Sequence, residues 1–305
     1  MQMKFKAHQS FFIRKGWLGK GLRAVSKDDS ILMPSRSKDA MDELGLGSNQ
    51  VVALRYWLQV TGLVEYADGR RRALKVTNLG ELIRKQDPYI EEIGTLWALH
   101  CNLASEKENA AAWYFLFNEF GQAIFDKESF VDALSRYVFN FNDKRDVARS
   151  SLEADFNCVL NTYIPHGRTS SKPVSPENVI DCPLGELGLV DVENKREKTY
   201  RKKPANQRTL PDLLVLYAIY SMRQKAADES SGLPSEIRLE TLLSGPCSPG
   251  SLYNLDSIGL LAKLYELEAN NLIRINRTAG LDVIRLEEPG RDSVWCLERY
   301  YEMLG

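Results

Sequence analysis

The 305-residue sequence lacks most of the short motifs by which enzymes are recognised. It contains no glycine-rich phosphate-binding loop, no H-E-x-x-H, no G-x-S-x-G and no C-x-x-C. Its three histidines lie in distant segments, so a metal triad or a Ser-His-Asp site is hard to assemble. We therefore expect a protein without catalytic activity, and the sequence predicts neither a cofactor nor a metal site.

Other absences bear on where the protein acts. Its five cysteines are scattered and odd in number, which favours reduced thiols over a disulfide framework or a zinc site. No run approaches the roughly 18 apolar residues of a membrane span, and the first residues lack the apolar core of a signal peptide. The net charge of −1 argues against indiscriminate coating of nucleic acid. We expect a soluble cytoplasmic protein that has no membrane partner and only a local nucleic-acid surface.

What the sequence does contain is a helix-turn-helix pattern within residues 37–86. A short helix is predicted over Asp39–Leu44, and a turn over residues 45–47. Ser48 or Asn49 can cap a second helix, because a short polar side chain accepts a hydrogen bond from an unpaired backbone N–H. Along the second helix one apolar face recurs at i, i+3 and i+7, formed by Val51, Leu54 and Leu58.

A hairpin pattern follows the second helix. Gly62 ends the helix, and residues 63–66 favour a strand. The Asp-Gly pair within residues 67–69 tolerates the positive φ of a tight turn. The return strand or its tip carries four cations, which are Arg70, Arg71, Arg72 and Lys75. Helix, turn, helix and hairpin in this order predict a winged helix-turn-helix domain.

Such a domain binds DNA by placing its second helix in the major groove, while cations contact the phosphates. The polar residues that would lie at the groove are Ser48, Asn49 and Gln50. The hairpin arginines would reach phosphates or a narrow minor groove, with a solvated hairpin tip as the alternative. The face opposite the apolar stripe resembles a surface that packs on another domain, and it consists of Asn49, Ala53, Tyr56 and Val60.

The densest cationic patch belongs to a second strand-turn-strand pattern, over residues 189–203. Its cations are Lys198, Arg201, Lys202 and Lys203. This pattern predicts either a second hairpin that contacts the DNA backbone or a solvated strand edge, on which lysines discourage pairing with another strand.

The remaining residues read mainly as helices. Asp87 and Pro88 suit the start of one helix, an aromatic-rich helix is predicted over residues 110–125, and Ser150 with Glu153 forms a capping box. An amphipathic helix over residues 211–227 and a helix-helix-hairpin pattern over residues 239–286 follow. The predicted fold class is mainly α with small β-hairpins. Three domains are predicted, which are an N-terminal arm with a winged helix-turn-helix (1–86), a central helical domain (87–165), and a hairpin, helix and winged-helix-like domain (166–305).

In the segment from His8 to Gly21, aromatics, cations and glycines alternate in a way that neither a helix nor a strand needs. It predicts either a loop that presents cations to an anion beside Trp17 or a packed N-terminal arm. The segment resembles the opening signature of a bacterial family, domain of unknown function 4007, which runs approximately G-H-E-T-F-x-L-R-x-G-W-L-x-K-G. The matching residues are His8, Phe11, Arg14, Gly16, Trp17, Leu18, Lys20 and Gly21, and the departures are Ala7, Gln9, Ser10 and Ile13.

Further matches to the family are spread over nearly the whole chain, and include Arg55–Leu58, Asp87–Tyr89, Trp113–Tyr114, Cys182–Leu184 and Ser248–Gly250. The resemblance implies that such proteins are encoded near phosphoadenosine-phosphosulfate-reductase-like proteins. These gene neighbourhoods are linked to DNA modification and phage defence. No catalytic residue is carried over with the resemblance.

Two functional hypotheses follow. The first is a non-catalytic component of a bacterial DNA-modification or phage-defence system that binds double-stranded DNA, with a regulatory role and a homodimer left open. The second is an adaptor that uses winged helices to bridge defence or sulfur-transfer enzymes. An exposed apolar patch at Ala53, Tyr56 and Val60 would favour the adaptor. A basic surface that joins the first hairpin to residues 198–203 would favour DNA.

Overall fold

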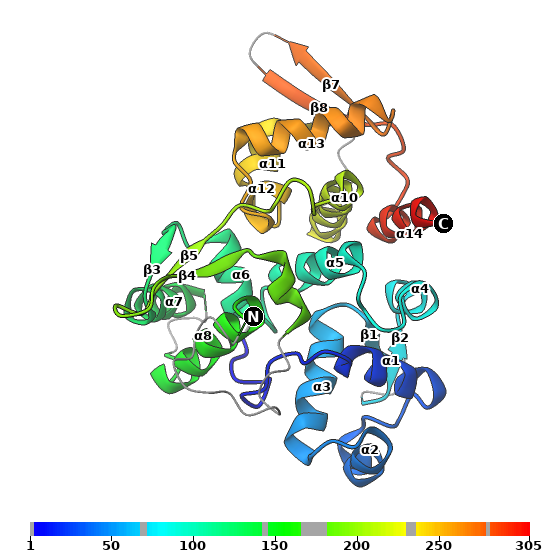
Figure 1. Ribbon diagram of the computed structural model, residues 1–305, viewed down its shortest axis with the longest axis vertical. Helices are drawn as coiled ribbons and strands as arrows, with labels where there is room; N and C mark the ends of the chain where they lie inside the picture. The colour runs from blue at the N-terminus through cyan, green and yellow to red at the C-terminus, as the bar shows by residue number, and fades with distance from the viewer. Residues whose placement is uncertain (1–2, 68–71, 142–145, 166–181, 230–235, 279–280) are drawn as a thin grey trace. The chain divides into compact units, whose positions relative to one another are not determined.

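The computed structural model describes residues 3–67, 72–141, 146–165, 182–229, 236–278 and 281–305 (Figure 1). The chain divides into two compact units, one formed by residues 1–116 and 120–203, and the other by residues 117–119 and 204–305. Within the described residues the fold is mainly helical, with three small antiparallel sheets, as the sequence predicts. The predicted boundaries at residues 86 and 165 fall inside the first unit and stay predictions.

The first part of the first unit contains three helices, a hairpin and a fourth helix. The elements are α1 (Trp17–Lys27), α2 (Ser37–Leu44), α3 (Ser48–Val60), β1 (Val64–Tyr66), β2 (Leu74–Val76) and α4 (Asn78–Gln86). Strands β1 and β2 are antiparallel, with Val64 opposite Val76. The backbone N–H of Leu74 donates to the carbonyl oxygen of Asp29 (2.8 Å), so the chain after α1 lies against β2. These elements match the helices and strands predicted over residues 39–66, whereas Asp68 and Gly69 of the predicted turn lie outside the described residues.

Helix α3 buries the predicted apolar face. Val51, Leu54 and Leu58 are at most 4% exposed. The predicted caps, Ser48 or Asn49, were wrong, because both residues are already helical and Gly47 precedes them in an extended conformation. The backbone N–H of Gly47 donates to Oε1 of Gln50 (2.9 Å), so the Gln50 side chain is used at the helix start.

The rest of the first unit comprises α5 (Ile93–Ala104), α6 (Ala111–Asn118, whose last two residues belong to the second unit), β3 (Ile124–Phe125), α7 (Lys127–Phe141), α8 (Arg149–Tyr163), β4 (Val190–Asn194) and β5 (Thr199–Lys202). A 3-10 turn over Pro183–Leu187 precedes β4. The predicted helix start at Asp87 was wrong, since Ile90 has a positive φ of 57° and α5 begins at Ile93. The Asp87 carboxylate instead accepts the backbone N–H groups of Glu91 and Glu92 (3.0 Å each).

Two other helix ends also differ from the prediction. Helix α6 ends at Asn118, short of the predicted end at residue 125, and residues 124 and 125 form strand β3. The capping box predicted from Ser150 and Glu153 is absent from α8. Ala148 precedes that helix, and Glu153 forms an ion pair with Lys127 (2.8 Å).

The N-terminal arm is packed into the first unit. His8 is fully buried, and its Nε2–H donates to Oδ1 of Asp155 in α8 (2.9 Å), while its Nδ1 accepts the N–H of Ser10 (3.1 Å). The His8 ring stacks on Trp57 with an angle of 19° between the planes. The packed-arm interpretation is therefore confirmed for this segment, and Trp17 is also buried.

The second unit is built around α10 (Asp212–Glu229). Its other elements are β6 (Glu236–Arg238), α11 (Leu239–Ser244), α12 (Pro249–Leu252), α13 (Ser257–Ala269), β7 (Ile273–Thr278), β8 (Leu281–Leu286) and α14 (Ser293–Leu304). Helix α10 was predicted to be amphipathic, but every side chain from Leu213 to Tyr220 is buried. The predicted β7–β8 hairpin is present, and β6 pairs with β8 to complete a three-stranded sheet.

Candidate nucleic-acid interface

Helix α3 presents a polar and partly aliphatic stripe to solvent. Ser48 and Asn49 are exposed, Val52 is 45% exposed, and Arg55 and Gln59 are half-buried. On the opposite face, Ala53 and Val60 are 0% and 4% exposed, in line with the expectation that this face packs on other residues. The residues that cover this side of the helix are distant in the sequence, and no local pattern identifies them.

Tyr56 shows how this cover is made. Its hydroxyl donates to the backbone oxygen of Asn109 (2.9 Å), and its ring lies against Trp57, with 4.9 Å between the ring centroids. Burial raises the pKa of Tyr56 well above its ordinary value, with a smaller contribution from the charge of Asp155. Tyr56 is therefore a packing residue, as expected from the sequence. The exposed stripe runs along the adjacent side of α3, through Val52, Arg55 and Gln59.

Of the four cations predicted for the hairpin after α3, the structure describes Arg72 and Lys75. Arg70 and Arg71 lie outside the described residues. Arg72 is exposed and forms no ion pair with the described part of the chain. Lys75 lies directly opposite Glu65 across the two strands and pairs with it (3.3 Å).

Arg55, which the sequence singled out only within the family resemblance, ties the helix to this hairpin. Its Nη1 donates to the backbone oxygen of Leu32 (2.6 Å), and its Nη2 to that of Arg72 (2.9 Å). The guanidinium carbon lies 5.7 Å from the centroid of the Tyr66 ring. Arg55 therefore positions Arg72 and Tyr66 relative to α3.

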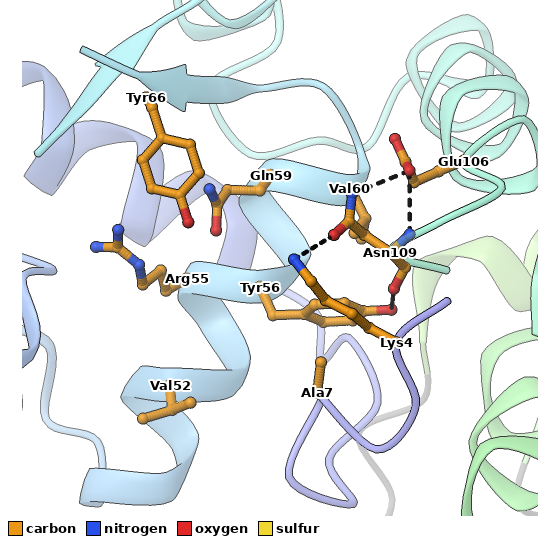
Figure 2. Close-up of a pocket in the computed structure, with 10 residues that line it drawn as sticks. All are labelled: Lys4, Ala7, Val52, Arg55, Tyr56, Gln59, Val60, Tyr66, Glu106 and Asn109. Carbon is orange, nitrogen blue, oxygen red and sulfur yellow. Dashed lines mark hydrogen bonds between the residues drawn. The ribbon is translucent and has the colours of Figure 1, made fainter. Parts of the chain in front are cut away.

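A pocket of about 260 Å³ opens beside the exposed stripe (Figure 2). Its walls come from the N-terminal arm, α3, β1 and the segment before α6, and the residues are Lys4, Ala7, Val52, Arg55, Tyr56, Gln59, Val60, Tyr66, Glu106 and Asn109. Lys4 Nζ donates to Oδ1 of Asn109 (2.8 Å). Oε1 of Glu106 accepts the backbone N–H (3.1 Å) and the Nδ2–H (3.0 Å) of Asn109. These contacts hold one wall in place.

Tyr66 forms the opposite side of the pocket and is 54% exposed. Hydrogen bonds from the side chains of Gln59 and then Arg55 lower the pKa of Tyr66, more than its partial burial raises it. Figure 2 shows Tyr66, Gln59 and Arg55 close together at the end of β1 and along α3. Gln59 and Tyr66 were missed from the sequence, because their proximity depends on the turn between α3 and β1.

The second cationic pattern forms strands β4 and β5, as predicted, but β5 lies between β3 and β4. The strand-edge interpretation was therefore wrong for this strand. Arg201 makes two hydrogen bonds of 2.6 Å to the carboxylate of Glu193, and Lys203 pairs with Asp191 (3.3 Å). Lys198 is exposed at the turn with a φ of 54°.

Lys202 of this sheet points inward. Its amine donates to the backbone oxygens of Leu116 (3.3 Å) and Phe120 (2.5 Å), next to the end of α6. Burial lowers the pKa of the Lys202 amine to about 8. Three of the four predicted DNA contacts in this region thus have partners within the protein.

Among the described residues, every helix is too short or too polar to span a lipid bilayer. Comparison with curated proteins gave no match. Two solved structures are similar over nearly the whole chain. The first is a magnesium-ion-bound structure of SspB, with 24% identity, a TM-score of 0.83, and coverage of 98% of this chain and 88% of that chain. A further structure of SspB has 25% identity, a TM-score of 0.82 and the same coverage. The family described as "Protein of unknown function (DUF4007)" matches residues 5–301, and the chain belongs to that family.

Proposed function

We propose that α2, α3, β1 and β2 form a winged helix that binds duplex DNA. The observation that carries this proposal is the exposed start of α3 beside a hairpin whose Arg72 has no acidic partner in the described chain. The start of a helix attracts phosphate or base acceptors, because its first backbone N–H groups are unpaired. Ser48 and Asn49 would contact the groove, whereas the side-chain oxygen of Gln50 already accepts the backbone N–H of Gly47.

The arrangement of α1 to β2 supports the winged-helix assignment. Three helices are followed by an antiparallel pair of strands, and the segment at Asp29 hydrogen-bonds β2 from the other side. In this type of domain the last helix enters the major groove and the hairpin contacts the backbone. A role in a bacterial DNA-modification or phage-defence system is proposed from the family resemblance alone.

The adaptor hypothesis is less well supported. It relied on an exposed apolar patch, but Ala53 and Val60 are buried and Tyr56 is hydrogen-bonded. A continuous basic surface through residues 198–203 has little support either, because Arg201 and Lys203 are ion-paired. The DNA-binding proposal therefore rests on the first hairpin and α3.

One SspB structure is described with a magnesium ion bound. In the part of this chain that the structure describes, no group of three or more His, Cys, Asp or Glu side chains is placed to hold a metal ion. We assign no residue to magnesium and derive no chemical step through it.

The proposal is tested by binding of the purified protein to a fluorescent DNA duplex across a salt series. The wild type should show a steep decrease of log K with log salt. Each phosphate contact contributes about 0.9 unit to this slope, so Arg70/Arg71/Arg72→Ala should make it shallower by up to about 2.7 units. Absence of wild-type binding at low salt, or an unchanged slope in the variant, would contradict the proposal.

Catalysis is tested separately, on a supercoiled plasmid incubated with the protein with and without magnesium. We expect the plasmid to stay supercoiled while it binds. Conversion to the nicked or linear form would overturn the expectation of a non-catalytic protein and leave the binding result intact.

A further inference from the structure

The pocket beside α3 has a size and a lining that suit one flat, polar ring system. Its volume of about 260 Å³ is below the roughly 300–1,000 Å³ of pockets that hold drug-sized ligands. It borders the exposed stripe of α3 and β1, the two elements proposed to contact DNA (Figure 2). We propose that this pocket receives one unpaired nucleobase of the bound DNA, an inference that rests on the proposed function.

Stacking on Tyr66 is the first contact that supports a base. More than half of the Tyr66 side chain is exposed, and the guanidinium of Arg55 holds the ring in place from 5.7 Å. Aromatic side chains bind unpaired bases in this way, because every base offers a π-face. A tyrosine that is kept exposed by a neighbouring arginine at a pocket wall is suited to such stacking.

Hydrogen bonding to the edge of the base is the second contact. Gln59 projects from α3 into the pocket, and its amide keeps one N–H donor and its carbonyl oxygen for a base when the other N–H is given to Tyr66. A glutamine amide can form two hydrogen bonds with the edge of one base. Asn109 is less available, since Lys4 and Glu106 already occupy its side chain.

The charges of the pocket favour a base over a phosphate group. Glu106 places a carboxylate in the wall, which would repel a phosphate. The donors of Arg55 are directed to the backbone oxygens of Leu32 and Arg72, and Lys4 is bonded to Asn109. Arg55 and Lys4 form no ion pair with the described residues and can attract the DNA backbone, while the pocket takes the neutral ring.

The experiment compares two duplexes that differ by one extra, unpaired adenine in one strand. The wild type should bind the bulged duplex more tightly than the fully paired duplex, because an unpaired base costs less to place in the pocket. Removal of one base-aromatic stack weakens binding by roughly five- to 150-fold, so Tyr66→Ala should lose most of this preference. Tyr66→Phe keeps the ring and should keep the preference, and Gln59→Ala should reduce it without loss of the stack.

The outcomes separate this inference from the proposed function. Equal binding of both duplexes by the wild type, with the salt slope still dependent on Arg70 to Arg72, would overturn the base pocket and leave DNA binding in place. An equal weakening of both duplexes by Tyr66→Ala would also overturn it. Binding of free adenosine in the absence of any bulge preference would show that the pocket takes a free nucleoside instead. Failure of both duplexes to bind would contradict the proposed function itself.

Discussion

The two cation-rich hairpins of the first unit resemble each other in sequence and differ in structure. In the β1–β2 hairpin, Lys75 pairs across the strands, and Arg72 is exposed without an acidic partner in the described chain. In the β4–β5 hairpin, Arg201 and Lys203 are ion-paired, and Lys202 donates to backbone oxygens. The number of cations in a segment therefore does not measure the charge that it offers to a ligand.

The position of each strand explains part of the difference. The β1–β2 pair is a two-stranded sheet, whereas β5 is the central strand of a three-stranded sheet. A central strand has neighbours on both sides, so acidic residues of β4 and carbonyl groups near β3 come within reach of its cations. Such cations are less available to phosphates.

The largest expected effect is on DNA binding, in two variants that each remove three charges. Lys198/Arg201/Lys203→Ala should change the salt slope by less than about one unit, compared with up to about 2.7 units for Arg70/Arg71/Arg72→Ala. The reason is that two of the three cations in the second hairpin already have carboxylate partners. Fluorescence anisotropy across the same salt series measures both slopes.

Equal slopes in these two variants would remove the distinction between the hairpins. Thermal unfolding of each variant checks that the slopes come from folded protein. A larger loss in the second hairpin than in the first would reverse the assignment and place the DNA on β4–β5.

A smaller effect concerns Lys202, whose burial lowers its pKa from 10.5 to about 8. Between these values the unfolded chain carries a proton that the folded protein has released, so the folding stability contributed by this group rises with pH. Below pH 8 both states are protonated, and the group adds no further pH dependence. From pH 8 to 10.5 the unfolding free energy of the wild type should therefore rise relative to that of Lys202→Met, by up to about 3 kcal/mol.

Urea unfolding of both proteins at several pH values measures this difference. Lys203→Met is the control, because it removes a lysine from the neighbouring position. A difference that stays flat with pH, or that moves toward Lys202→Met, would contradict the buried environment of the amine. In that case Lys202 would return to the group of cations available to DNA.

The smallest effect is expected from Glu193→Gln, which releases Arg201 from its carboxylate while the side-chain shape is kept. Exposed ion pairs contribute little to stability, so the melting temperature should fall only slightly, and less at high salt. The slope of DNA binding should not change. A slope that becomes steeper by about one unit would show that the released Arg201 contacts a phosphate.

The sequence predicted the local parts of the fold well. The helices and strand over residues 37–66 follow from apolar periodicity and glycine positions, both of which act over a few residues. The predictions failed where distant groups compete for the same atoms. Asp87 accepts N–H groups of the following loop, and Glu153 pairs with Lys127, so neither side chain serves the helix start expected of it.

The candidate site was predicted only in part from the sequence, because it too depends on contacts between distant segments. Ser48, Asn49 and Arg72 are exposed, in line with their proposed role. The pocket instead needs the N-terminal arm and the segment near Asn109 to meet α3, and no pattern in the sequence links these segments. The pairing of β3 with β5 was missed because β3 is two residues long and carries little alternation of its own.

The buried pair of His8 and Asp155 also sets an order of events during synthesis. The two residues are 147 positions apart in the chain. At roughly 5–20 residues per second, a ribosome needs about 7 to 30 s to reach Asp155 after it has added His8. Helices α2 and α3 can form in that interval, whereas the arm that supplies Lys4 and Ala7 to the pocket gains its His8–Asp155 hydrogen bond only when α8 emerges. This contact of the arm is thus made late, after the helix that the arm covers.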